Sequence, residues 1–304
     1  MRQLSSKNTK HKTTKKATIY KRIAAFLHML KMEVSNCMGL INTQYLIHQS
    51  SSFQKLAARF VPYFKGALEK EWSSILSHLQ YHGMTKCWNT CQQMIDQLKE
   101  KGYFHLVMKE YKLLQKQWGG PDVPIFILPV NESSKEIREQ FYYQSGIAFD
   151  DKIFLFLSTN TPKERIGTLM THEYHHVCRL HFLTKEEKDF TFLDTIMMEG
   201  LAEYAVYHRY GENYTAKWTT LYNESQLERM YKKWVSNHLQ TKVQNDERLI
   251  QNLLYGKGNY PKMLGYAVGF HMVKKYFNQH RVSEDSVIKE PAESFLKVME
   301  QISE

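Results

Sequence analysis

The chain has 304 residues, of which 42% are hydrophobic and 24% charged. This balance is typical of a globular protein and excludes a chain that is disordered throughout. The formal net charge is +10, but residues 1–22 carry eight Lys or Arg side chains and no Asp or Glu. The rest of the chain is therefore close to neutral. Binding to nucleic acid through a basic face is not expected, and any such contact is weak and confined to the tail.

Hydrophobic runs and cysteines indicate a protein of the cytoplasm. No run of about 18 apolar residues occurs, so we expect no transmembrane helix. Ile23–Leu30 follows the basic tail, but it is short, contains His28 and lacks a cleavage site of small residues. The four cysteines are too few for a disulfide-stabilised fold of this length, and we expect reduced thiols.

The first third of the chain has the periodicity of helices. Residues 1–22 are predicted to be a disordered basic tail, and residues 23–118 a helical N-terminal region. Within that region, apolar residues recur at spacings of three and four in Phe53–Phe64 and in Met94–Leu114. The turn residues Gly119–Asp122 end this helical pattern. They begin a second region, residues 119–304, whose pattern is different.

The second pattern opens with strands. Short runs of β-branched and aromatic residues predict three of them, at Val123–Val130, Gly146–Phe149 and Lys152–Ser158. Asp150–Asp151 favours a tight hairpin between the last two. Pro124 and Pro129 place the first strand near a sheet edge, because proline cannot donate a backbone hydrogen bond.

Helices follow the strands. Thr161–Glu164 has the pattern of a capping box, so a helix is expected to begin there. A second helix is expected over Phe190–Tyr210, ending at Gly211. Three more are predicted near Asn223–His238, Pro261–Phe277 and Pro291–Met299. The sequence thus predicts an α+β fold that is mainly helical, with a small β-sheet.

The helix after the strands contains the pattern H-E-x-x-H, from His172 to His176. Residues four apart lie on one face of a helix, so both imidazoles can reach one ion. Neutral imidazole is a common ligand of Zn²⁺. Glu173 lies beside that face, where it can accept a proton from a zinc-activated water.

A site of this kind needs a third protein ligand, and the next helix offers one. Glu199 supplies a carboxylate at the expected order along the chain. Glu203, one turn later, can accept a hydrogen bond from the free ring nitrogen of a ligand histidine. Gly200 and Ala202 are small, so we expect them to let the two metal-binding helices approach closely.

These residues carry a resemblance to known proteins. H-E-x-x-H followed by a glutamate on a later helix resembles the gluzincin metallopeptidases, and Glu199–Tyr204 is similar to the third-ligand segment of zinc aminopeptidases of that clan. A narrower likeness is to a bacterial family of predicted zinc-dependent proteases, a domain of unknown function. It rests on five segments, Gly119–Pro124, Ile153–Ser158, His172–Leu180, Glu199–Tyr204 and Gly265–Gly269.

The resemblance implies a zincin-type two-helix metal site within residues 119–304, with Zn²⁺ held by His172, His176 and Glu199. Between His176 and Glu199 lie 22 residues, a few more than is common in gluzincins. The metzincin pattern does not fit, because Arg179 and Phe182 stand where it requires Gly and His.

A donor to the developing oxyanion is also needed, and the resemblance makes Tyr266 the candidate. An equally weighted alternative is that Tyr266 is only a core aromatic, and Tyr260 and His271 are weaker candidates. Arg179 either complements the helix dipole or binds an anion, and His175 lies off the ligand face.

We therefore expect a zinc-dependent metallopeptidase that hydrolyses a peptide or protein substrate. An edge strand could pair with an extended peptide, although a purely structural strand is the more common case. The main alternative is a catalytically inactive scaffold or binding protein stabilised by zinc. A nucleic-acid-binding protein acting through the tail would leave the paired motifs unexplained.

Overall fold

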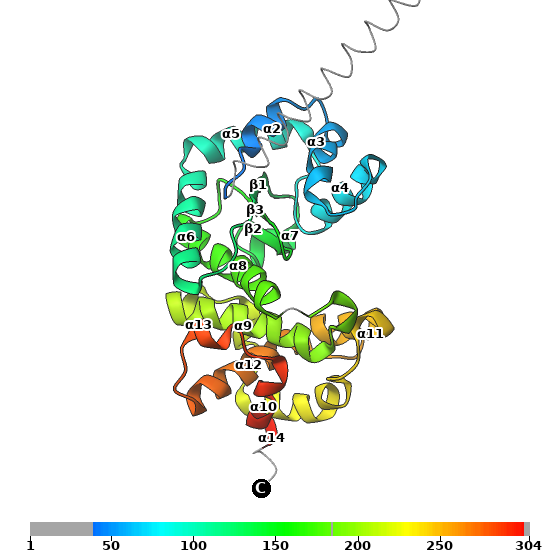
Figure 1. Cartoon of the computed structure of the whole chain (residues 1–304), viewed down its shortest axis with the longest axis vertical. Coiled ribbons are helices and arrows are strands. Elements are labelled where there is room, and N and C mark those ends of the chain that lie inside the picture. The colour runs from blue at the N-terminus through cyan, green and yellow to red at the C-terminus, as the bar shows by residue number, and fades with distance from the viewer. Residues whose placement is uncertain (1–38, 184, 301–304) are drawn as a thin grey trace, which may run out of the picture. The chain divides into compact units, whose positions relative to one another are not determined.

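The computed structural model describes residues 39–183 and 185–300 (Figure 1). The predicted basic tail and the start of the predicted helical region lie outside these residues. The described residues from Leu40 onward form one compact unit. No helix of the described residues is both long enough and apolar enough to cross a lipid bilayer.

The described chain is mainly helical with one small sheet, and the predicted fold class is confirmed. The elements in chain order are α2 (Thr43–His48), α3 (Phe53–Phe60), α4 (Trp72–Tyr81), α5 (Trp88–Glu100), α6 (Tyr103–Trp118), β1 (Ile125–Pro129), α7 (Lys135–Glu139), β2 (Gln144–Ala148), β3 (Ile153–Leu157), α8 (Ile166–Phe182), α9 (Phe192–Tyr210), α10 (Glu224–Met230), α11 (Glu247–Tyr255), α12 (Leu264–Gln279), α13 (Glu284–Val287) and α14 (Lys297–Glu300).

The three strands form a mixed sheet in the order β1-β3-β2. β2 and β3 are the predicted hairpin, antiparallel with Ala148 opposite Ile153, and β1 joins β3 in parallel. Because side chains alternate across a strand, the two faces meet different helices. Phe60 of α3 packs on Phe126 and Phe154. On the opposite face, α8 lies against β2.

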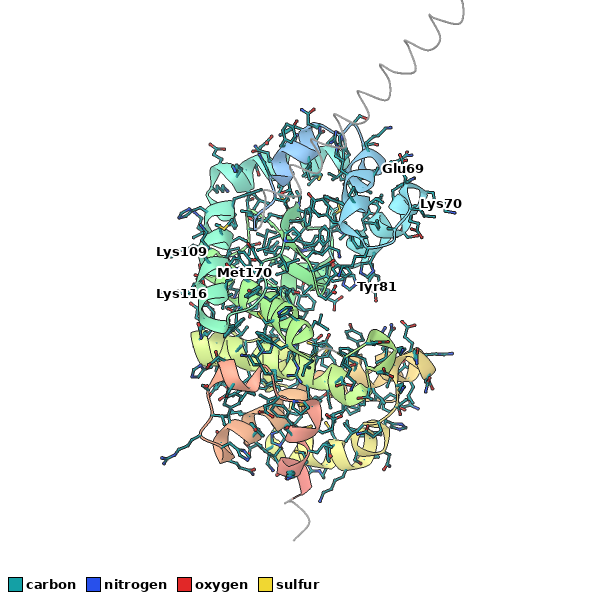
Figure 2. The ribbon with its side chains drawn as sticks, in the orientation of Figure 1. Glu69, Lys70, Tyr81, Lys109, Lys116 and Met170 are labelled. Carbon is teal, nitrogen blue, oxygen red and sulfur yellow. The ribbon has the colours of Figure 1, made fainter. Side chains whose placement is uncertain are left out.

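Two hydrophobic cores lie on either side of the α8–α9 pair. The first joins α2 to α6, the sheet and α8, and the second joins α9 to α14. Figure 2 shows side chains filling the interior, where Met170 lies fully buried, whereas Lys109 and Lys116 are exposed on α6. The domain division at residues 118 and 119 stays a prediction, although hydrophobic side chains from both sides of it share the first core.

Two helix starts differ from the prediction. Thr161 caps no helix, because its hydroxyl accepts from the Ser158 N–H and donates to the Tyr143 carbonyl. A 3₁₀ turn over Lys163–Arg165 follows, and α8 begins at Ile166. α12 begins at Leu264 rather than near Pro261, because Met263 adopts a left-handed φ of 55°.

Two of the last three predicted helices change their helical geometry along their length, although Glu224–His238 is helical throughout. α10 continues as a π-helical turn at Tyr231–Val235, and Pro291–Met299 divides into a 3₁₀ turn and the start of α14. α9 agrees best with prediction. A capping box between Thr191 and Asp194, which the sequence analysis did not single out, sets its start, and Gly211 ends it.

Gly200 contacts a different helix from the one predicted. A Cβ at Gly200 would lie 2.5 Å from the backbone carbonyl carbon of Gly269 on α12, and one at Gly269 would lie 2.2 Å from the Ile196 oxygen. Gly200 therefore lets α9 approach α12, not α8. This close approach carries Glu199 and the residues of α12 into one site.

Replacement of Gly200 by Ala should destabilise the protein by about 1–3 kcal/mol, because the added methyl group overlaps the α12 backbone. Chemical denaturation measures the change in the free energy of unfolding. Lys112→Ala, on the exposed side of α6, is the control and should change it by less than about 0.5 kcal/mol. A Gly200→Ala protein as stable as the wild type would contradict the backbone contact.

Candidate metal centre

A cavity of about 480 Å³ lies along α8 and contains the residues singled out in the sequence. Its walls come from β2, α8, α9, α12 and the loop after α9. His172, Glu173, His176, Glu199 and Tyr266 all line it. The structure therefore brings together side chains that are up to 94 positions apart in the sequence.

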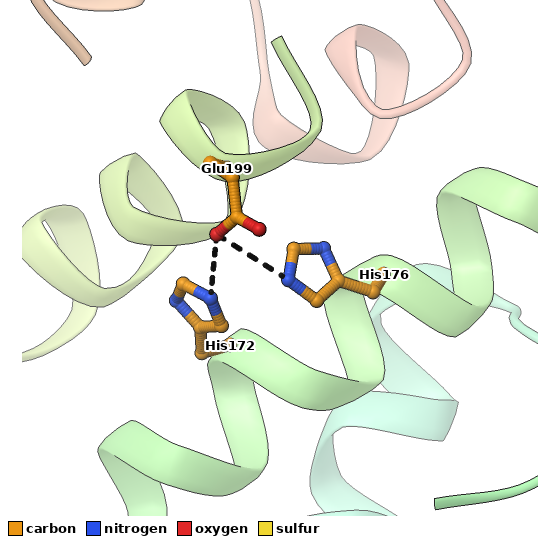
Figure 3. Close-up of side chains that lie close together, drawn as sticks. All are labelled: His172, His176 and Glu199. Atoms are coloured by element: carbon orange, nitrogen blue, oxygen red, sulfur yellow. Dashed lines mark ion pairs between the residues drawn. The ribbon is translucent and has the colours of Figure 1, made fainter. Parts of the chain in front are cut away.

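Three of these side chains converge on one point (Figure 3). His172 and His176 lie one turn apart on α8, with ring centroids 4.7 Å apart. The Glu199 Oε2 atom reaches from α9 to within 3.3 Å of His172 Nε2 and 3.8 Å of His176 Nε2. One donor atom from each residue lies within 4.8 Å of the others. Two imidazoles and a carboxylate at this separation are a donor set that fits Zn²⁺.

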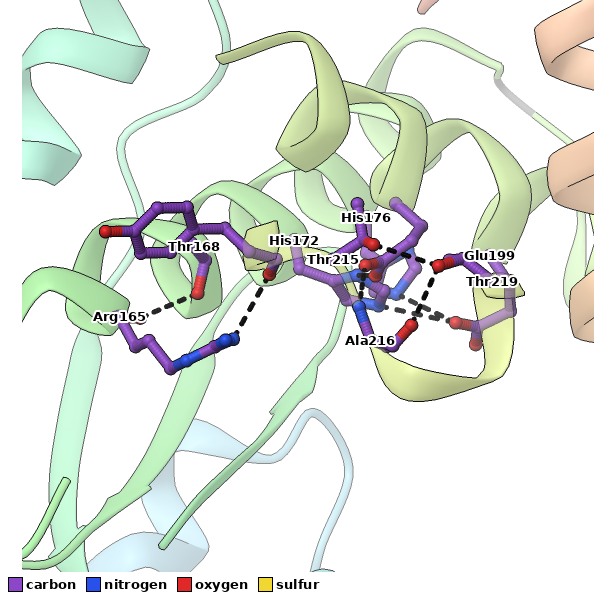
Figure 4. A network of polar contacts seen from close by, with 10 residues as sticks. Arg165, Thr168, His172, His176, Glu199, Thr215, Ala216 and Thr219 are labelled. Carbon is purple, nitrogen blue, oxygen red and sulfur yellow. Dashed lines mark hydrogen bonds and ion pairs between the residues drawn. The ribbon is translucent and has the colours of Figure 1, made fainter. Parts of the chain in front are cut away.

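A network of polar contacts surrounds His172 (Figure 4), and Glu203 of α9 orients the histidine ring within it. A carboxylate can only accept, so His172 Nδ1–H donates to Glu203 Oε2, at 3.1 Å. The other oxygen accepts from the Ala216 N–H at 2.5 Å. Hydrogen bonds among Thr215, Ala216 and Thr219 brace this loop. With Nδ1 occupied, His172 presents Nε2 to the cavity, as a metal-ligating histidine does.

The carboxylates also determine the charge state of the histidines. Burial lowers the pKa of His172, but hydrogen bonds to Glu199 and Glu203 outweigh it and hold that pKa well above its usual value. Burial lowers the pKa of His176 to about 3, so this ring is neutral and ready to ligate. Burial opposes ionisation of Glu199, yet the two histidines keep its pKa below the usual value.

Glu173 lies beside the three converging side chains, with only 6% of its surface exposed. Burial raises its pKa to about 7. The carboxylate packs against Gly146 of β2, where a Cβ would lie 2.4 Å from Glu173 Oε1. Any larger residue at position 146 would displace the carboxylate.

Tyr266 lies in the cavity as well as against aromatic neighbours. Its ring packs at the edge of Trp218, 5.2 Å between centroids, and beside Tyr255. Burial, followed by the charges of Glu199 and Tyr255, raises its pKa far above the usual value. The phenol is thus protonated and close to the metal-binding group. Neither Tyr260 nor His271 lines the cavity.

Two other residues of α8, Arg179 and His175, are buried away from the cavity. Arg179 is fully buried and does not line the cavity, and its guanidinium donates to the Ile288 and Glu290 carbonyls. It holds the C-terminal segment rather than a substrate anion. His175 is buried against the edge of Trp118.

Other cavity residues were not predicted from the sequence. His82 and Tyr255 reach it from distant segments, and Arg165 reaches it from the turn before α8. No local pattern identifies these residues, because the fold alone places them at the cavity.

Together these features define a mainly helical α+β protein with a candidate metal centre of two histidines and a glutamate. Residues 103–297 match the family described as predicted Zn-dependent protease (DUF2268). The chain belongs to this family.

Two relatives from Bacillus subtilis (strain 168) are similar to the chain. The uncharacterized protein YjaZ is 50% identical over 262 residues, which is 86% of this chain and all of YjaZ. The uncharacterized protein YjfC is 28% identical over 136 residues, 41% of this chain and 44% of its own. No solved structure matches.

Affinity for zinc should rise with pH. The raised pKa of His172 means that the metal-free site holds a proton on this ring, and zinc must displace it. Below that pKa, the apparent dissociation constant should increase about tenfold for each unit by which the pH falls. Competition with a chromophoric chelator across the pH range measures this slope.

Glu203→Gln provides the comparison. It removes a carboxylate that stabilises the protonated ring, so the pH dependence should become shallower. Affinity at high pH should also fall about 10- to 100-fold, because the ring is no longer held. An affinity that does not change with pH in the wild type would contradict the assignment of His172.

Proposed function

We propose that this protein is a gluzincin-like zinc metallopeptidase that hydrolyses peptide bonds. The observation that carries the proposal is the convergence of His172, His176 and Glu199 within one cavity, next to Glu173. The family's description as predicted Zn-dependent proteases supports it. Three protein ligands leave a coordination position for substrate or water, as catalytic zinc sites do and structural ones do not.

The donor atoms are of the type that zinc prefers, and both histidine rings have a feature that favours metal binding. His176 is neutral, and His172 has its second nitrogen bound by Glu203. Zinc bound there would supply Lewis acidity, which makes water a nucleophile at neutral pH and polarises a peptide carbonyl. The remaining steps belong to side chains of this chain.

Glu173 is the proton carrier in this proposal. A general base works best when its pKa is close to the working pH, and burial raises the pKa of this carboxyl to about 7. It would take a proton from the attacking water and deliver it to the leaving amine. The contact with Gly146 holds the carboxylate at the wall that faces the donor atoms.

Tyr266 and strand β2 complete the site in this proposal. The protonated phenol of Tyr266 can donate to the negative charge that develops on the carbonyl oxygen. β2 is an edge strand whose five residues line the cavity. An extended peptide can therefore add to the sheet through backbone hydrogen bonds.

The free thiols of Cys87, Cys91 and Cys178 support a reducing compartment, and we place the protein in the cytoplasm. A peptide or protein is the substrate. The predicted weak contact of the basic tail with nucleic acid concerns residues outside the described part of the chain.

Replacement of Glu173 by Gln should lower the turnover of a peptide mixture at least about 100-fold and leave zinc bound. The variant keeps the shape of the side chain but removes its ability to take a proton. Product formation by mass spectrometry and zinc by elemental analysis are measured on the same sample.

Glu164→Gln, an exposed carboxyl before α8, is the control and should be as active as the wild type. A Glu173→Gln protein that is loaded with zinc and fully active would refute the mechanism. A wild-type protein that binds zinc but cleaves no peptide would favour the zinc-stabilised scaffold instead.

A further inference from the structure

Arg165 lies at one end of the cavity, directly before α8. Its guanidinium lies over the ring of Tyr142, 3.5 Å from the centroid, and 5.4 Å from the ring of Tyr214. It donates to the carbonyls of Asn213 and Tyr214, at 2.9 and 3.2 Å. These contacts hold the side chain in one orientation and use two of its five N–H donors.

Lys217 adds a second positive charge at the same place. Its ammonium lies 5.2 Å from the centroid of Tyr142, and it donates to the Glu139 carbonyl. Tyr142 and the next residue, Tyr143, have left-handed φ values of 52° and 61°, which are unfavourable for side chains of this size. We call Tyr142 and Arg165, which line the cavity, together with the exposed Lys217 beside them, the cationic end of the cavity.

The charge of the cationic end is not neutralised within the described residues. Neither Arg165 nor Lys217 has a carboxylate oxygen within 4.0 Å there; both use backbone carbonyls and a tyrosine ring instead. At the centre of the cavity the pattern is opposite, since Glu173, Glu199 and Glu203 gather there. An arginine held by neutral partners keeps its attraction for an anion, and its planar fork suits a carboxylate.

The cationic end lies at a defined distance from the metal-binding group. Arg165 precedes His172 by seven residues, which along a helix corresponds to about 10 Å. An extended peptide advances about 3.3–3.6 Å per residue, so this distance corresponds to about three residues.

Strand direction points to the same end. Tyr142 stands two residues before β2, so β2 begins at the cationic end, and Gly146 further along lies against Glu173. A peptide that adds antiparallel to β2 would therefore run with its carboxyl end toward Arg165. The expected direction of the peptide therefore brings its carboxyl end to the positively charged end of the cavity.

We propose that the cationic end binds a carboxylate of the substrate about three residues beyond the bond to be cleaved, and so sets where the peptide is cut. This inference rests on the proposed peptidase function. The carboxylate is either the C-terminus of a short peptide or the side chain of Asp or Glu. In the first case the protein releases short C-terminal fragments, and in the second it cuts within chains ahead of acidic residues.

The test uses the zinc-loaded full chain and three matched pools of synthetic peptides. One pool has free C-termini and no acidic residues, a second has amidated C-termini and no acidic residues, and a third has amidated C-termini with one Glu at each position in turn. Mass spectrometry of the products gives the cleaved bond and its distance from the carboxylate.

Cleavage should be about 10- to 100-fold faster in a pool that offers a carboxylate than in the amidated neutral pool, as expected for a charge-assisted hydrogen bond. The first and third pools distinguish the two sources of carboxylate. Arg165→Gln should remove most of this preference, whereas Arg165→Lys should keep part of it.

Peptide binding is measured separately, in the Glu173→Gln variant. This measurement does not depend on turnover. There, a free-acid peptide should bind more tightly than its amide, and Arg165→Gln should equalise the two. Arg59→Gln is the matched control, because Arg59 also donates to a backbone carbonyl but does not line the cavity. Zinc content checks that each variant keeps its site.

Equal cleavage of all three pools by the wild type would overturn this inference and leave the peptidase function standing. An undiminished preference in a zinc-loaded Arg165→Gln protein would overturn it in the same way. Failure of the wild type to cleave or bind any pool would overturn the peptidase function, and this inference with it.

Discussion

The hydrogen bonds of Glu203 connect the three segments that build the site. One carboxylate oxygen holds His172 on α8, the other holds the backbone of Ala216, and the side chain itself stands on α9. A buried carboxylate is costly unless its oxygens are paired, and only 5% of this side chain is exposed. Both oxygens accept hydrogen bonds. The cost of burying the carboxylate is therefore offset only when α8, α9 and the loop that contains Ala216 occupy their native positions. The ring of His172 is thereby oriented before any metal arrives.

The same helix α9 is positioned from its other side by α12. The absence of side chains at Gly200 and Gly269 lets the two backbones touch. Glu199, directly before Gly200, and Tyr266, three residues before Gly269, are thereby brought into the cavity from two helices. Because α8 belongs to one hydrophobic core and α9 to the other, the donor set joins the two cores of the folded unit. Zinc would then stabilise the junction as well as serve the reaction.

Local patterns predicted the parts of this protein that local physics determines. The spacing of His172 and His176 on one helix face, the hairpin of β2 and β3, and the end of α9 at Gly211 follow from helix and turn geometry. Long-range packing decided the rest. No local rule shows that Gly200 faces α12 or that β1 pairs with β3 in parallel. The burial of Arg179 could not be predicted, because a charged residue near a helix end is normally exposed, whereas here two distant carbonyls accept its hydrogen bonds. The position of Arg165 beside Tyr142 likewise follows from the fold and not from a local sequence pattern.

The central claim is that His172, His176 and Glu199 hold one zinc ion. The most direct measurement is elemental mass spectrometry of the untagged protein after dialysis against zinc-free buffer. We predict about one zinc per chain in the wild type and in His181→Ala, an exposed histidine of the same helix, and loss of zinc in His172→Ala. A wild-type protein that holds no zinc, even after zinc is added back, would contradict the account, as would retention of zinc by His172→Ala.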